Sequence, residues 1–116
     1  MKMQGFTLAD AVMERSPGQA ADIFAGDLVG GTDGAPITIG YGRWGPHTTL
    51  SETMAVDDVM VVLEGGLTVS SDDLEVSAGP GDIVHMPKGA VVTIVAGAAG
   101  AVTAYVTYPD WRAARG

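Results

Sequence analysis

Two stretches in the middle of the chain decide the fold: Asp57-Asp58-Val59-Met60-Val61-Val62-Leu63-Glu64-Gly65-Gly66 and Gly79-Pro80-Gly81-Asp82-Ile83-Val84-His85-Met86-Pro87-Lys88-Gly89. The first is an acidic pair that enters an apolar strand and ends in a Gly-Gly turn. The second is a Gly-Asp turn followed by a four-residue strand and a Pro-Lys-Gly turn. Short strands between glycine-rich turns are typical of an all-β sandwich or barrel.

The composition indicates one acidic domain. The 116 residues leave room for a single domain with a modest core. The formal net charge is −8 with six basic residues, which argues against nucleic acid and anionic membrane surfaces as partners. The absence of cysteine excludes disulfides, thiolate metal ligands and cysteine nucleophiles. The chain has neither the apolar run of a signal peptide nor the roughly 20 apolar residues of a membrane helix, so we expect a cytoplasmic protein.

The rest of the chain predicts further short strands after one helix. Thr7 and Asp10 form a capping-box pattern, which predicts a helix of about two turns up to Arg15. Turn residues then recur roughly every eight to twelve positions. The predicted strands are 23–28, 37–44, 48–54, 58–64, 67–70, 73–77, 83–86, 91–95 and 101–108. Residues 97–100 fit a hairpin loop, and Trp111 lies in a last turn that packs against the body.

The strand predicted at 58–64 has two apolar faces. Residues 58, 60 and 62 share one face, and residues 59, 61 and 63 share the other. A barrel lumen accounts for one face. A second sheet, the N-terminal segment or another subunit must cover the other. Because the domain is also small, we expect a homodimer.

The two stretches resemble the two sequence motifs of the cupin family, G-x5-H-x-H-x3/4-E-x6-G and G-x5-P-x-G-x2-H-x3-N. Gly65 matches the closing glycine of the first motif, while Gly81, Pro87 and Gly89 match the second. The resemblance implies an all-β cupin, that is, a jelly-roll β-barrel with a short N-terminal helix. It implies a single cupin domain over 1–116, with the helix and a strand at about 6–30 and the barrel core at about 37–111.

The metal-ligand positions of the cupin motifs are mostly changed. Counting back from Gly65 places Asp58 at the glutamate position and Glu52 and Met54 at the two histidine positions. In the second motif Val92 stands at the histidine position. The resemblance therefore leaves Asp58 as the one ligand position with a carboxylate of the right kind.

The chain is similar, more particularly, to the single-domain relatives of the ethanolamine-utilisation protein Q (EutQ) cupins. The matching elements are Trp44, Asp57-Asp58, Val62-Leu63-Glu64-Gly65-Gly66-Leu67, Pro80-Gly81-Asp82-Ile83-Val84-His85-Met86-Pro87-Lys88-Gly89 and Tyr105-Val106-Thr107-Tyr108-Pro109-Asp110-Trp111. The chain differs from that pattern by Asp58 in place of Glu and by His85 in place of an aromatic residue. Both positions are expected to face inward. The resemblance implies an acetate kinase role as one alternative function.

Three residues are candidates for acid–base catalysis: Asp58, His85 and Glu52. Asp58 either caps a strand entry in water beside Asp57 or points inward, where desolvation raises its pKa and makes it a useful acid or base. The same two alternatives hold for Glu52. His85 is a hydrogen-bonded core histidine, a group that fills volume where the subgroup has a ring, or a ligand or proton-transfer residue.

Other candidates concern substrate and metal binding. The candidate substrate-binding residues are Tyr41, Arg43, Met54, Met60, Val92 and Tyr105. Arg43 lies either at a sheet edge or against an anion. Glu52, Asp58 and His85 together form a two-carboxylate, one-histidine set that suits Fe, Mn, Zn or Ni. A barrel without metal is the alternative, because the H-x-H pair is absent.

The sequence leaves several functions open. The first is a small-molecule enzyme that uses inward carboxylates and a histidine for isomerase, cyclase or lyase chemistry. The second is a binding or accessory protein without turnover, and the third is a structural dimer with a closed pocket. The chain has no G-x4-G-K-[ST] loop, which weakens the acetate kinase alternative.

Overall fold

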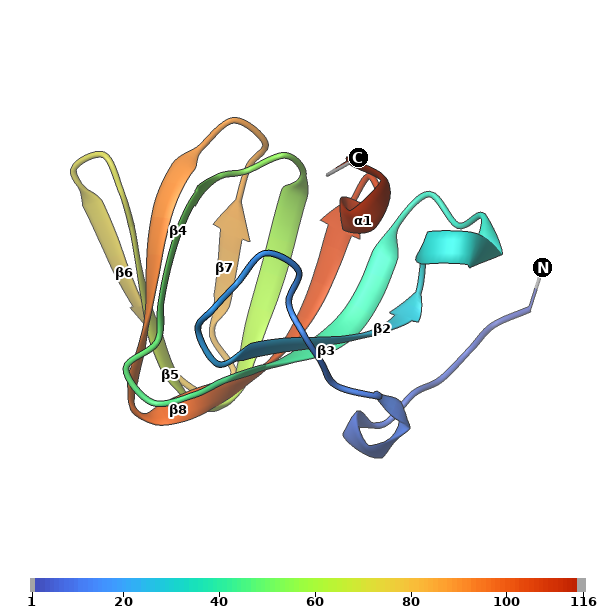
Figure 1. Ribbon diagram of the computed structural model, residues 1–116, viewed down its shortest axis with the longest axis horizontal. Coiled ribbons are helices and arrows are strands. Elements are labelled where there is room, and N and C mark those ends of the chain that lie inside the picture. The colour runs from blue at the N-terminus through green and yellow to red at the C-terminus, as the bar shows by residue number, and fades with distance from the viewer. Residues whose placement is uncertain (1, 115–116) are drawn as a thin grey trace.

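The computed structural model describes residues 2–114 and shows a chain made almost entirely of β-strands (Figure 1). The elements are η1 (Leu8–Asp10), β1 (Glu14–Arg15), β2 (Ile23–Val29), η2 (Gly31–Asp33), β3 (Thr38–Trp44), β4 (Thr49–Thr53), β5 (Asp57–Ser71), β6 (Leu74–Ala78), β7 (Ile83–Met86), β8 (Val91–Tyr108) and α1 (Trp111–Ala114). Within this described range, no helix is long and apolar enough to cross a membrane.

Two long strands, β5 and β8, join the two halves of the molecule. The hydrogen-bonded order is β1-β2-β3-β8-β5-β6, with β4 added to β8 and β7 added to β5, and every pairing is antiparallel. The first part of β5 pairs with the end of β8 and with β7. The last part of β5 pairs with the start of β8 and with β6. The result is the predicted all-β fold, a jelly-roll barrel (Figure 1).

Glycines let the two long strands bend without breaking. The pairing of β5 with β8 shifts register between Val62 and Glu64 and between Gly65 and Leu67. Gly65 has φ +71°, and a Cβ on it would lie 2.0 Å from the carbonyl oxygen of Gly100. A side chain is therefore excluded at this crossing. The predictions of a Gly-Gly turn after Glu64 and a hairpin loop at 97–100 are wrong, because both segments are bends inside paired strands.

The predicted N-terminal helix is reduced to one turn. The Asp10 carboxylate accepts a hydrogen bond from the Thr7 backbone N–H at 2.7 Å, as the capping pattern predicts. Ala11 is already extended, however, and β1, which pairs with β2, begins three residues further on. Gly26 of β2 permits this, since a Cβ on Gly26 would lie 2.9 Å from the Ala11 Cβ. Sheet pairing therefore overrides the local helix signal.

The core lies inside the roll and consists of alternate residues of the strands. Its buried members are Ile23, Trp44, Met54, Met60, Val62, Leu67, Val69, Ala78, Val84, Met86, Val92, Ile94, Ala96 and Ala101. Val62 is fully buried. The predicted division of 58–64 into two faces is confirmed, because residues 60 and 62 are buried and residues 59 and 63 are exposed.

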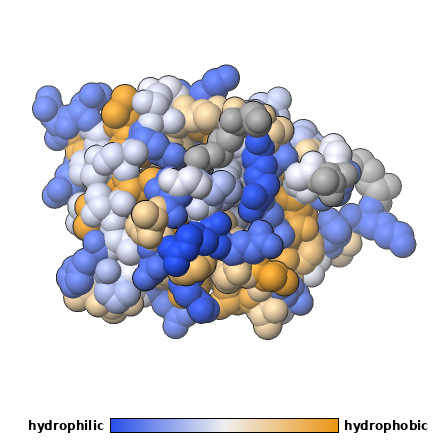
Figure 2. All heavy atoms as spheres, in the orientation of Figure 1, coloured by the Kyte–Doolittle hydropathy of each residue, from blue (hydrophilic) through white to orange (hydrophobic). Residues whose placement is uncertain are grey.

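Several apolar side chains remain exposed on the outer side of β5, β7 and β8. We call this set the outer face, and its members are Val59, Leu63, Ile83, Val106 and Tyr108. The exposed fractions run from 37% for Val59 to 64% for Ile83. Figure 2 shows hydrophobic patches that interrupt the polar surface on the face drawn there. The homodimer expected from this face stays a prediction.

Candidate functional site

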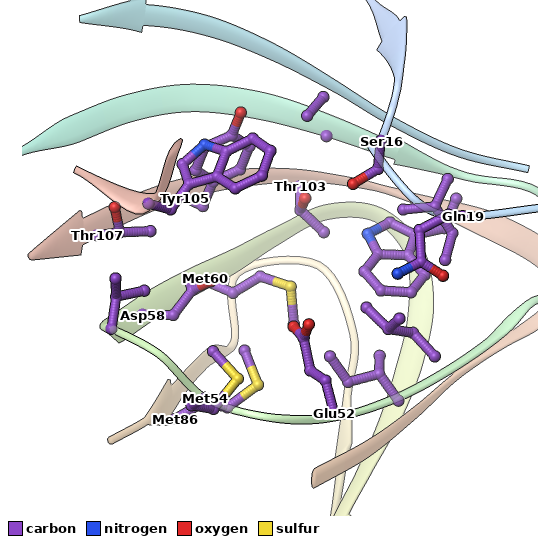
Figure 3. Close-up of a pocket in the computed structure, with 18 of the residues that line it drawn as sticks. Ser16, Gln19, Glu52, Met54, Asp58, Met60, Met86, Thr103, Tyr105 and Thr107 are labelled. Carbon is purple, nitrogen blue, oxygen red and sulfur yellow. The ribbon is translucent and has the colours of Figure 1, made fainter. Parts of the chain in front are cut away.

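The inner side of the roll carries a cavity of about 390 Å³ that is open to solvent, and Figure 3 shows residues that line it. Strands β2 to β5, β7 and β8 contribute to its wall, as do the segment before β2 and the start of α1. The lining residues are Ser16, Gln19, Ile23, Phe24, Ala25, Gly42, Trp44, Leu50, Glu52, Thr53, Met54, Ala55, Val56, Asp58, Met60, Met86, Ile94, Thr103, Tyr105, Thr107 and Trp111. A concave, mainly apolar space with a few polar groups is typical of a small-molecule site.

Two carboxylates reach the cavity from neighbouring parts of the chain. Glu52 lies on the inner side of β4. It alternates along the strand with three exposed residues, Thr49, Ser51 and Thr53. Asp58 lies on the same side of β5 as the buried Met60. Strands β4 and β5 therefore place two acidic side chains at the same cavity, and Figure 3 shows both of them.

Asp58 occupies the more unusual environment. Its Oδ1 atom is buried and has no hydrogen-bond partner among the described residues. Burial is the main cause that raises the pKa of Asp58; with the negative charge of Glu52 raising it and His85 lowering it, the pKa is about 7. Both protonation states of Asp58 are consequently populated near neutral pH.

A network around Asp27 closes one side of the cavity. The Tyr105 hydroxyl donates a hydrogen bond to Asp27 Oδ1, and Trp111 Nε1 donates to the same oxygen at 3.1 Å. Arg112 Nε donates to the other oxygen at 2.7 Å. Burial raises the pKa of Tyr105, and the bond to Asp27 raises it further, so the phenol stays neutral. This network fixes two cavity-lining rings, Tyr105 and Trp111.

A second carboxylate, Asp110, anchors the turn that carries Trp111. It accepts hydrogen bonds from the Thr38 hydroxyl and from the Gly31 backbone N–H, the latter at 2.9 Å. The Thr38 hydroxyl oxygen in turn accepts from the Trp111 backbone N–H at 3.2 Å. The hydrogen bond from Thr38 lowers the pKa of Asp110. The predicted packing of Trp111 against the body is therefore confirmed, with its anchors now defined.

Three methionines form the deep apolar part of the cavity wall. Met54, Met60 and Met86 are each no more than 5% exposed, and Trp44 lies on the same inner surface. Figure 3 shows the three sulfur-containing side chains near Glu52 and Asp58. Methionine side chains are flexible and polarizable, so they adapt to an irregular or aromatic ligand.

Five of the residues predicted for the site line the cavity: Glu52, Met54, Asp58, Met60 and Tyr105. Their roles in binding or catalysis stay predictions. Asp27 and Trp111 were not among the predicted site residues. An acidic residue in the middle of an otherwise apolar segment, as at Asp27, is the signal that would have indicated a buried polar network.

The inward position predicted for His85 is wrong. In the pairing of β7 with β5, Met86 stands opposite Asp58 and His85 stands opposite Val59. Residues opposite each other in an antiparallel pair point to the same side, so His85 lies on the outer side. Its side chain is 59% exposed, and its Nε2 lies 3.4 Å from Oδ1 of Asp57. His85 is therefore not assembled with the cavity carboxylates.

Three of the predicted substrate-binding residues also lie outside the cavity. Residues 38, 40, 42 and 44 of β3 are buried, so the alternation places Tyr41 and Arg43 on the other side, where Arg43 is exposed. Val92 is inward and only 2% exposed, but it borders a separate hollow that it shares with His85. None of these three is positioned to contact a ligand in the cavity.

The jelly roll and its inward carboxylate position define a protein of the cupin fold. The family model described as ethanolamine utilisation protein EutQ matches residues 10–113. The chain therefore belongs to the EutQ family.

Three known proteins are similar to this chain to different degrees. The acetate kinase EutQ of Escherichia coli (strain K12) is 33% identical over 66 residues, and this chain spans only 28% of its length, with 57% of the chain matched. A protein of unknown function from Rhizobium leguminosarum bv. viciae 3841 is 60% identical, and its crystal structure has a TM-score of 0.79 with 94% of this chain and 99% of that chain covered. The cupin domain of Schizosaccharomyces pombe Cnp3 is 11% identical, with a TM-score of 0.73 and coverage of 96% and 77%, which shows a shared fold alone.

The donor set does not fit the metal centre that cupins can hold. The predicted ligands were Glu52, Asp58 and His85, and the outward position of His85 removes the only nitrogen donor. Between residues 2 and 114 there is no group of three or more His, Cys, Asp or Glu side chains placed to hold a metal ion. The assignment of these three residues as a metal set is therefore corrected, and no chemical step is derived through a metal.

Proposed function

We propose that this cupin binds a small, largely apolar organic molecule in its cavity and that Asp58 transfers a proton to or from that molecule. Such chemistry belongs to isomerases, cyclases and lyases. The observation that supports this most directly is the buried Oδ1 of Asp58, which has no partner among the described residues. A buried carboxyl group destabilises the folded state unless a partner or a ligand compensates, so its presence in a cavity indicates use.

The surroundings of Asp58 suit acid–base chemistry at neutral pH. A pKa of about 7 allows the group to be both a base and, after accepting a proton, an acid. Glu52 supports this by repelling the charged form of Asp58. The buried methionines give the cavity an apolar wall, and an apolar surrounding strengthens electrostatic interactions. Tyr105 contributes a fixed ring, because its hydroxyl proton is directed to Asp27.

Two other functions are less well supported. Phosphoryl transfer from a nucleotide needs cationic groups around the phosphates, and the cavity presents two carboxylates to its ligand. An acetate kinase activity like that named for the Escherichia coli relative is therefore disfavoured for this cavity. A binding protein without turnover would use the same cavity, and only a measurement of proton transfer separates it from the enzyme.

The ring opening of 5-nitrobenzisoxazole provides that measurement. In this reaction a base removes the carbon-bound proton, the ring N–O bond breaks, and a coloured cyanonitrophenolate forms. We expect the wild-type rate to rise with pH through about 7, as Asp58 loses its proton. Asp58→Asn should lower the protein-catalysed rate by about a hundredfold or more, as is typical for the loss of a general base.

Asp57→Asn is the matched control, because Asp57 precedes Asp58 and does not line the cavity. It should keep the wild-type rate within about twofold. A rate that is unchanged in Asp58→Asn would contradict the proposal. If the probe shifts the methionine methyl resonances but no turnover occurs, the binding protein without chemistry is the correct alternative.

A further inference from the structure

The hydroxyl groups beside Asp58 direct their own protons to other parts of the protein. We propose that the cavity takes a phenolic ligand, whose aromatic ring lies against the methionines and Trp44 and whose neutral hydroxyl group donates a hydrogen bond to Asp58. This inference rests on the proposed function, because it names the class of ligand for the same cavity. It adds two properties that the proton-transfer chemistry alone does not specify, an aromatic ring and a hydroxyl donor.

The pairing of β5 with β8 decides which groups lie beside Asp58. Asp58 stands opposite Thr107, and Met60, two residues further along β5, stands opposite Tyr105. Residues opposite each other in an antiparallel pair point to the same side, and so do residues two apart on one strand. All four line the cavity, and Figure 3 shows them together. Strand β8 therefore brings two hydroxyl groups to the part of the cavity that holds Asp58.

Neither hydroxyl group gives its proton to Asp58. The Thr107 hydroxyl donates to the carbonyl oxygen of Pro109 at 3.0 Å, and the Tyr105 hydroxyl donates to Oδ1 of Asp27. Because a hydroxyl group has one proton and two lone pairs, both oxygens are left as acceptors toward a ligand. The ionised carboxylate of Asp58 is also an acceptor, and its buried Oδ1 has no partner among the described residues. A ligand that meets these oxygens must therefore supply the donor.

The apolar wall of the cavity favours an aromatic body for that donor. The rings of Trp44, Tyr105 and Trp111 line the cavity together with the three methionines. Tyr105 lies over Gly40 of β3, since a Cβ on Gly40 would come 2.6 Å from the Tyr105 hydroxyl oxygen. Asp27 accepts hydrogen bonds from both Tyr105 and Trp111. Rings that are already held in place contact an aromatic ligand with little further loss of side-chain freedom.

A hydroxyl group on an aromatic ring suits the environment of Asp58. A phenol has a pKa of about 10 in water, as the tyrosine side chain does, so it is neutral at pH 7. It therefore brings no second negative charge to the carboxylate. A hydrogen bond from a neutral donor to an ionised carboxylate is roughly twice as strong as one between neutral groups. The ligand should consequently gain most when Asp58 is charged.

Binding of a phenol should therefore depend on pH. The titratable and charged groups that act on Asp58, or on Tyr105 beside it, are Glu52 of β4, His85 on the outer side of β7, Asp27 of β2 and Arg112 of α1. A donor to the charged form of Asp58 lowers the pKa of that group. Since the pKa of free Asp58 is about 7, the affinity for a phenol should rise between about pH 6 and about pH 8.

The test compares three probes of similar shape: 4-methylphenol, 4-methylanisole and 4-methylcyclohexanol. The first has an aromatic ring and a donor, the second lacks the donor, and the third has a donor but no aromatic ring. Binding is followed by the methyl resonances of Met54, Met60 and Met86, which line the cavity. At pH 8 we expect 4-methylphenol to bind at least about tenfold more tightly than 4-methylanisole and at least about threefold more tightly than 4-methylcyclohexanol.

Two variants with matched controls locate the donor site. Asp58→Asn should reduce the preference for 4-methylphenol over 4-methylanisole by about tenfold and remove its rise with pH, because the charged acceptor is lost. Asp57→Asn should keep both, since Asp57 does not line the cavity. Thr107→Val removes one acceptor oxygen at nearly constant shape and should reduce the preference by about threefold. Thr93→Val, on the same strand but outside the cavity, should leave it unchanged.

Two results would overturn the inference. One is 4-methylanisole or 4-methylcyclohexanol binding as tightly as 4-methylphenol, and the other is no methyl shift with any of the three probes up to millimolar concentration. Neither result decides the proposed function, because 5-nitrobenzisoxazole has no hydroxyl group and its ring opening is measured separately. A protein that opens 5-nitrobenzisoxazole through Asp58 but shows no preference for 4-methylphenol would keep its function and lose this class of ligand.

Discussion

Asp57 and Asp58 are neighbours in the sequence, but the pleat of β5 gives them different surroundings. Asp57 lies at the surface, where it accepts a hydrogen bond from the Lys88 backbone N–H at 3.2 Å and lies near His85. Asp58 lines the cavity with a buried oxygen that has no partner among the described residues. A carboxylate in water beside hydrogen-bond donors hardly changes the free energy of folding, whereas an unpaired carboxylate in an apolar cavity destabilises the folded state. The pair therefore separates a solvated carboxylate from a chemically useful one.

The same contrast extends over β5 and its neighbour β7. Met60 and Met86 lie on the inner side and are buried, whereas Val59 and His85 lie on the outer side and are exposed. The inner side combines acids with soft apolar groups. The outer side combines apolar groups with solvated charges. We infer that the inner side serves a ligand and the outer side serves association with a second copy of the chain.

The largest expected effect that separates the two aspartates is on stability as a function of pH. The folded state raises the pKa of Asp58 to about 7, while the unfolded chain has a value near 3.8. Between these values the folded state binds more protons, so the stability of the wild type should fall as pH rises from about 4 to about 7. The loss at pH 8 is up to roughly 4 kcal/mol for a shift of this size.

Asp58→Asn should remove this loss, and it should be more stable than the wild type at pH 8 and close to it at pH 4. Urea unfolding at both pH values measures the difference. Asp57→Asn should not stabilise the protein at pH 8. If the free energy of unfolding of Asp58→Asn depends on pH in the same way as that of the wild type, the Asp58 carboxyl group is not buried in solution.

The next effect compares Met60 with Val59. Met60 is 4% exposed and packs in the core, so Met60→Ala should lower the free energy of unfolding by about 2–3 kcal/mol. Val59→Ala on the outer side should lower it by less than about 1 kcal/mol. Urea unfolding of both variants at micromolar concentration decides between them. Equal losses would indicate that Val59 is also buried in solution.

The sequence predicted the fold correctly because the fold depends on pattern. The glycines of both cupin motifs, the alternation of 58–64 and the strand at Ile83–Met86 all agree with the structure. The errors arose where pairing overrides local signals. Glycines that look like turns, such as Gly65, form bends inside paired strands. The helix predicted after Thr7 gives way to the short pairing of β1 with β2.

The site was predicted only in part, because inward and outward positions depend on register. Glu52 and Asp58 were found from their motif positions, and both line the cavity. His85 was placed inward from its position in the family pattern, where it replaces an aromatic residue, but the pairing of Met86 with Asp58 turns His85 outward. A shift of one residue in an antiparallel pair reverses every side chain, and no local pattern fixes it. The bond of Asp27 to Tyr105 joins residues too distant in sequence for any motif to reveal.

The third prediction concerns association through the outer face. A second copy that covers Val59, Leu63 and Val106 would remove these exposed apolar groups from water. Val59→Asp should weaken self-association by at least about tenfold, which corresponds to about 1.4 kcal/mol. Light scattering across a concentration series measures this. Leu74→Asp, on β6 outside this face, is the control. A wild-type protein that is monomeric at micromolar concentration would contradict the proposal.

The smallest expected effect distinguishes the two tyrosines on opposite sides of the β3–β8 pair. Tyr105→Phe removes one of three donors to Asp27 and leaves those of Trp111 and Arg112 in place. The expected loss of stability is about 1 kcal/mol, the usual net contribution of one hydrogen bond. Tyr41→Phe on the outer side should change stability by less than about 0.5 kcal/mol.

Because the Tyr105 hydroxyl donates to Asp27, Tyr105→Phe should keep the ring-opening rate within a few-fold of the wild type. A loss of rate as large as that of Asp58→Asn would instead show that the Tyr105 hydroxyl takes part in proton transfer, and the assignment of that role to Asp58 alone would be wrong.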